Sequence, residues 1–98
     1  MLIIHDDVQS ILESFEADPQ EEEFILCQIL TGGAWAYLED GWIHIYSDNA
    51  EMKELVSTIS HELAHKYENE LKALDDEDFA DRCGAMAQEA YMLAQKVI

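Results

Sequence analysis

Apolar residues recur at helical spacing near the start of the chain. A helix is predicted to follow Asp6 or Asp7, because aspartate is a good N-cap residue, and to end before Pro19, which cannot continue it. One face of this helix is apolar, as expected for a helix that packs on a core. The residues of this stripe are Val8, Ile11, Leu12 and Phe15.

The middle of the chain carries short apolar runs separated by turn residues, a pattern typical of strands. After a polar connector at residues 20–23, strands are predicted at 24–30, 34–38 and 42–46, with turns at 31–33 and 39–41. In the last strand, aromatic side chains alternate with Ile43 and Ile45, so the two sets face opposite sides of the sheet. These runs predict a three-stranded antiparallel meander.

A second helical stripe follows the strands. A polar cluster at residues 47–49 can cap this helix, and Glu51 and Glu54 suit its positive first turn. Its apolar stripe consists of Met52, Leu55, Val56, Ile59 and Leu63. A last helix, running to residues 96–98, is predicted to pack on it. The whole chain, residues 1–98, is therefore predicted to be a single α+β domain with a modest core.

The motif His61-Glu62-Leu63-Ala64-His65 lies on this second helix and is the main chemical signal in the chain. An H-E-x-x-H string places two imidazoles one turn apart, so that both can bind one zinc ion. Glu62 lies about 100° around the helix, where a carboxylate can act as general base toward a water on the metal. The motif predicts a zinc-dependent hydrolase.

A catalytic zinc needs a third protein ligand. His5, His44 and the carboxylates after the motif are the candidates. Glu77 and Asp81 are four residues apart, so Glu77 can bind the metal while Asp81 hydrogen-bonds a ligand histidine and fixes its orientation.

At this point the chain resembles a known group, the gluzincin zinc peptidases. Residues 59–65, followed by Glu77-x-x-Ala80-Asp81-Arg82-Cys83-Gly84, look like the two core motifs of the CAAX-processing and heat-shock peptidases. The chain is also similar to the ImmA-like peptidases of mobile elements and, in size, to the minigluzincins. The resemblance covers well over half the chain, and its first motif is the more specific. It implies a zinc metalloendopeptidase, which is latent if a terminal segment such as residues 96–98 covers the cleft.

The chain departs from this pattern because only eleven residues, 66–76, separate the motifs. For two antiparallel helices, a turn near residues 69–71 sets Glu77 opposite Leu63. A turn near residues 74–77 sets Glu89 there instead. Glu77 is preferred as the third ligand, and Glu89 is the alternative.

The predicted reaction also needs a donor that stabilises the transition state. His44 and Tyr67 are the candidates. The strand before the motif helix belongs to a sheet whose edge, in the gluzincins that the chain resembles, pairs with an extended peptide substrate.

The chain is strongly acidic, with 22 acidic and 5 basic residues and a net charge of −17. This charge opposes binding to nucleic acids and anionic membranes and favours a basic peptide or protein partner. It also supports an alternative function, an acidic peptidase-like binding or inhibitor protein that engages a basic partner without catalysis. No targeting pattern or membrane-spanning run is visible, and Cys27 and Cys83 are read as buried, reduced thiols, so a cytoplasmic protein is predicted.

Overall fold

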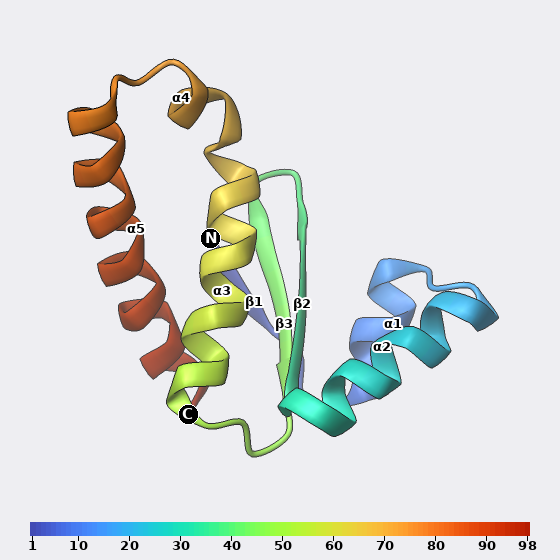
Figure 1. Cartoon of the computed structure of the whole chain (residues 1–98). Coiled ribbons are helices and arrows are strands. Elements are labelled where there is room, and N and C mark those ends of the chain that lie inside the picture. Colours follow the sequence, from blue (N-terminus) through green and yellow to red (C-terminus); the bar gives the residue numbers. More distant parts are fainter.

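A three-stranded sheet separates two helical layers in the computed structural model, which describes all residues 1–98 (Figure 1). The layer with α3 and α5 covers one face, and α1 and α2 lie on the other side. The elements are β1 (Leu2–Ile4), α1 (Val8–Phe15), α2 (Pro19–Gly32), β2 (Ala34–Glu39), β3 (Trp42–Ser47), α3 (Met52–Lys66), α4 (Glu68–Lys72) and α5 (Asp76–Val97). The α+β class predicted from the sequence is confirmed.

The sheet is mixed, with the strand order β1-β3-β2. β2 and β3 form the antiparallel hairpin that the sequence predicts, and the turn between them has Asp40 and Gly41 at positive φ. The central strand β3 also pairs in parallel with β1. Because β1 has only three residues, its sequence carries too little alternation to reveal it.

The predicted strand at residues 24–30 is wrong, because this segment belongs to helix α2. Asp18 and Glu21 form a capping box around Pro19, three signals that start a helix. Ile25 and Ile29, one turn apart, are the buried residues of α2. The polar residues 20–23 are therefore the first turn of α2, and its end is marked by Gly33, whose φ of 76° suits glycine.

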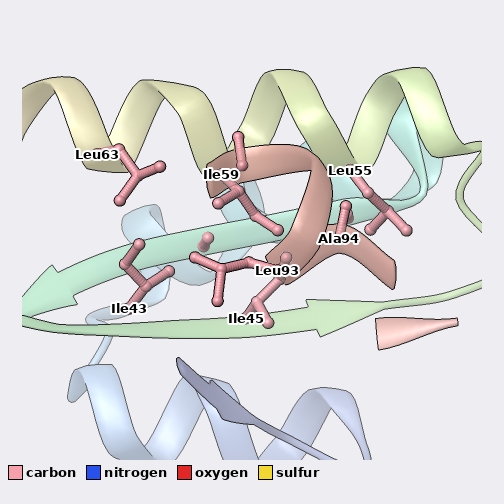
Figure 2. Close-up of a cluster of buried hydrophobic side chains, with 10 residues drawn as sticks. Ile43, Ile45, Leu55, Ile59, Leu63, Leu93 and Ala94 are labelled. Carbon is pink, nitrogen blue, oxygen red and sulfur yellow. The ribbon is translucent and has the colours of Figure 1, made fainter. Parts of the chain in front are cut away.

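The main core lies between the sheet and helices α3 and α5. Figure 2 shows Ile43 and Ile45 of β3 packed among Leu55, Ile59 and Leu63 of α3, with Leu93 and Ala94 of α5 beside them. The predicted apolar stripe of α3 thus provides its buried face. A smaller core on the other side of the sheet joins α1 and α2 and consists of Leu12, Ile25 and Ile29.

Helix α5 runs antiparallel to α3, and the short helix α4 forms part of their connection (Figure 1). The side chain of Asp75 accepts a hydrogen bond from the backbone N–H of Asp78, so Asp75 caps the start of α5. The predicted cap cluster of α3 behaves differently. Glu51 occupies the N-cap position without a side-chain hydrogen bond, and Asn49 lies in the preceding turn at a φ of 57°.

The two cysteines are free. Cys27 is exposed on α2, and Cys83 is half-buried on α5. The prediction that both thiols are buried is therefore wrong for Cys27, because residues 24–30 form a helix with only one buried stripe. None of the helices combines the length and the apolar character that crossing a lipid bilayer requires.

Candidate metal centre

The two histidines of the motif lie together on the exposed surface of α3. The Nε2 atoms of His61 and His65 form a hydrogen bond of 3.2 Å, and the rings meet edge to face with their centroids 4.7 Å apart. Two nitrogens that each bind a tetrahedral zinc at about 2.05 Å lie about 3.3 Å from one another. The pair therefore already has the spacing of two ligands on one zinc ion.

Glu62 lies on the inner side of the same helical turn. Only 9% of its surface is exposed, and it is the one charged residue buried in the chain. Burial raises the pKa of Glu62, because a carboxylate loses hydration there, while His61 and His65 pull the pKa in the other direction. A carboxyl group whose pKa is raised accepts a proton more readily than an exposed carboxylate does.

Two surface hollows meet at His61. The first, with a volume of about 320 Å³, lies beside the histidine pair and is also lined by Glu68, Lys72 and Phe79. The second, about 360 Å³, lies between α3, α2 and β2, and Glu62 lines it together with His61 and residues 34–36. The proposed base and a proposed ligand thus share the hollow next to strand β2.

Neither Glu77 nor Glu89, the candidates for the third ligand, lies beside the two histidines. No three His, Cys, Asp or Glu side chains form a group that could hold a metal ion. Glu77 is exposed in the first turn of α5, and Glu89 is half-buried and lines a separate hollow near the C-terminal end of α5. Asp81 is also exposed and makes no hydrogen bond with either imidazole.

The reason lies in the connection between α3 and α5. The prediction that Glu77 or Glu89 lies opposite Leu63 requires two straight antiparallel helices joined by a tight turn. Instead, α3 ends at Lys66, α4 occupies residues 68–72, and α5 starts at Asp76. Of the α5 residues, Phe79, not Glu77 or Glu89, lines the hollow beside the histidines.

His5 and His44, the other histidines considered as ligands, belong to a different site. Nε2 of His5 is hydrogen-bonded to Nδ1 of His44 at 3.0 Å, and the His44 ring stacks on Tyr37. His44 alternates with Ile43 and Ile45, which face α3, so it lies on the opposite face of the sheet from the motif. The prediction that His44 donates a hydrogen bond at the metal is therefore wrong, because the sheet separates the two sites.

Tyr67, the second predicted donor, packs toward α5. The guanidinium of Arg82 lies over its ring, 4.3 Å from the centroid, and Tyr67 also packs against the main core. Two residues along a helix correspond to about 200° of rotation, so Tyr67 and His65 point to different sides of the chain. These contacts give Tyr67 a role in joining α3 to α5.

The residues 96–98, suggested as a cover for the cleft, lie elsewhere. The C-terminus ends beside the first turn of α3, away from the later turns that carry the motif (Figure 1). Val97 packs against the main core there.

Comparisons of this chain with protein-family models, with curated proteins and with solved structures give no match.

Proposed function

We propose that this protein is a small zinc-dependent peptidase in which His61 and His65 bind the metal and Glu62 is the general base. The observation that carries the proposal is the 3.2 Å separation of the two Nε2 atoms, with a buried carboxyl group on the same turn. The two nitrogens lie close enough together to bind one ion, and imidazole is a preferred zinc ligand. The arrangement therefore suits zinc better than a pair of unrelated surface histidines would.

When bound, zinc would activate a water molecule and polarise the carbonyl of the scissile bond. Glu62 accepts a proton from the water molecule while the water oxygen forms a bond to the carbonyl carbon. The same carboxyl then gives the proton to the leaving nitrogen as the C–N bond breaks, so Glu62 returns to its starting state. The burial of Glu62 supports this role, because it raises the pKa of the carboxyl group and so favours the protonated form that the second step needs.

The second hollow is the proposed place for the substrate. β2 is an edge strand of the sheet, and an extended peptide can add to such an edge through main-chain hydrogen bonds. The hollow brings this strand next to Glu62. The net charge of −17 would favour peptides that carry basic residues.

The test combines metal binding with peptide cleavage. The purified protein is dialysed against zinc, its bound metal is measured, and cleavage of a mixed library of quenched fluorescent peptides is followed. We expect one zinc per chain and peptide cleavage that Glu62→Gln reduces by about 10²–10⁴-fold without loss of metal. Glu51→Gln, an exposed acid at the start of α3, is the matched control and should behave like the wild type.

Absence of bound zinc, or cleavage that persists in Glu62→Gln, would contradict the proposal. An acidic binding protein without catalysis is the alternative, and it is favoured by the charge and by the absence of three gathered ligands. It predicts that a lysine-rich peptide binds equally well to the wild type and to Glu62→Gln. That binding should weaken strongly between 50 and 300 mM salt, on the order expected for screened charges.

A further inference from the structure

The hollow beside the histidine pair contains a single acidic side chain, that of Glu68. Neither Glu77 nor Glu89 lines it. A tetrahedral zinc held by two histidines commonly takes a carboxylate as its third protein ligand, with a fourth position left open. Glu68 is therefore the candidate for the third ligand, because it lines the same hollow as both histidines.

Glu68 follows His65 by three residues and lies just beyond the end of α3. His61, His65 and Glu68 occupy positions i, i+4 and i+7, which fall on one face of a continuous helix. The backbone changes course at Tyr67, where φ is −102° and ψ is 15°, and α4 begins there. The N–H of Tyr67 donates to Leu63 at the end of α3, and the N–H of Leu71 donates to Tyr67 in α4. No N–H of residues 68–70 donates to residues 64–66, so the helix is interrupted at Tyr67. The three side chains nevertheless line one hollow, which keeps the carboxylate of Glu68 on the same side of the molecule as the two imidazoles.

The present partner of Glu68 is easily displaced. Its Oε1 lies 3.3 Å from Nζ of Lys72, and both side chains are more than half exposed, at 57% and 71%. Ion pairs this exposed contribute about 0–1 kcal/mol. A divalent cation between His61 and His65 would compete well with one solvated ammonium group for the same carboxylate.

We propose that Glu68 is the third protein ligand of the ion held by His61 and His65, which it reaches by turning away from Lys72. This inference rests on the proposed metal site and replaces Glu77 and Glu89 in it. All three ligands then come from the eight-residue stretch 61–68, and α5 contributes Phe79 as an apolar wall of the hollow. Lys72 becomes a competitor whose removal strengthens metal binding.

The test measures the affinity for Zn²⁺ by competition with a chromogenic chelator, and the ligand field of bound Co²⁺ by absorption spectroscopy. We expect Glu68→Gln to weaken zinc binding by about 10–100-fold or more, the range reached by mutating even a hydrogen-bond partner of a ligand, and to change the Co²⁺ spectrum. Glu77→Gln and Glu89→Gln are the matched controls and should leave both measurements unchanged. Lys72→Met should tighten binding a few-fold.

A further variant separates ligation from simple charge. Glu68→His removes the negative charge but keeps a metal ligand, so it should retain tight binding, whereas a purely electrostatic role would make it as weak as Glu68→Gln. Circular dichroism checks that each variant is folded, and Glu68 is exposed, so its replacement should leave the fold intact.

The outcomes distinguish the two proposals. If the wild type binds zinc and Glu68→Gln binds it equally well, Glu68 is not a ligand while the proposed function stands. If Glu77→Gln or Glu89→Gln loses the metal instead, the ligand comes from α5. If the wild type binds no zinc, the metal site and the proposed function fail together.

Discussion

The two histidine pairs, His5–His44 and His61–His65, lie on opposite faces of the sheet. They differ in the hydrogen-bond partners of their ring nitrogens. In the first pair, His5 follows β1 and His44 lies in β3, and the second ring nitrogen of His5 is hydrogen-bonded to Ser10 at 2.7 Å. In the second pair, His61 and His65 come from one helix, and their Nε2 atoms are hydrogen-bonded only to each other, at 3.2 Å. The first pair joins three elements, whereas the second is open to solvent.

The difference separates a structural polar network from a candidate ligand site. The chain Ser10–His5–His44 satisfies both nitrogens of His5 within the protein, and Tyr37 covers the His44 ring, with centroids 4.5 Å apart. Such a network stabilises one conformation. His61 and His65 are exposed, and their Nε2 lone pairs can both turn to one cation when neither nitrogen carries a proton. Two neighbouring histidines are therefore weak evidence for a metal site by themselves. The hydrogen-bond partners of all their ring nitrogens must also be known.

The largest expected difference between the pairs is in metal affinity. His61→Asn or His65→Asn should weaken zinc binding by at least about 100-fold, because each loses a ligand directly, which costs more than the loss of a supporting hydrogen bond. His5→Asn and His44→Asn should leave the affinity unchanged. The measurement is chelator competition at pH 7.5. Equal losses from both pairs would show that the sheet does not separate their roles.

The effect on stability is expected to be smaller, and here the first pair should matter more than the second. In metal-free protein, His44→Ala should lower the free energy of unfolding by about 1–3 kcal/mol, because it removes a partly buried hydrogen bond and the contact with Tyr37. His61→Ala should change it by less than about 0.5 kcal/mol, as is usual at an exposed position. Urea unfolding with a chelator present measures both. A larger loss for His61→Ala would mean that the motif has a structural role even without metal.

The smallest expected effect is a pH dependence from the first pair. Burial lowers the pKa of His5, and His44 lowers it further, while Asp6 and Asp7 act in the opposite direction. The unfolded chain therefore takes up a proton on His5 more readily than the folded chain does, so His5 costs stability as the pH falls through its ordinary pKa of 6.5.

The corresponding measurement is metal-free unfolding in urea at pH 8 and pH 5.5. Wild type should lose more stability on acidification than His5→Asn does. The comparison with the variant removes the contribution of Glu62, whose raised pKa works in the opposite sense and stabilises the fold as the pH falls. A larger loss in His5→Asn would contradict the assignment.

Helix α3 shows what local pattern can predict. Its apolar stripe, the offset face with His61 and His65, and the alternation of Ile43 and Ile45 before it were all readable, because the side-chain period follows from the backbone geometry of each element. The Asp75 cap of α5 is a local signal of the same kind, since a cap depends only on residues a few positions away.

Residues 24–30 show where a local pattern fails. A short apolar run fits a buried strand or a helix equally well by periodicity, and the deciding signals were the capping residues Asp18 and Glu21 that precede it. The sequence does not reveal β1, because a segment of three residues forms a strand only by pairing with the edge of β3.

The sequence by itself determined the elements with strong periods, the acidic charge and the motif that sets two imidazoles on one helical turn, because these depend on neighbouring residues. Only the tertiary structure decided which acid stands beside those imidazoles, that His5 meets His44, and that the sheet lies between the two pairs. These facts depend on the course of the chain between α3 and α5 and on the order of the strands. Both are set by packing between distant segments, which no local pattern encodes.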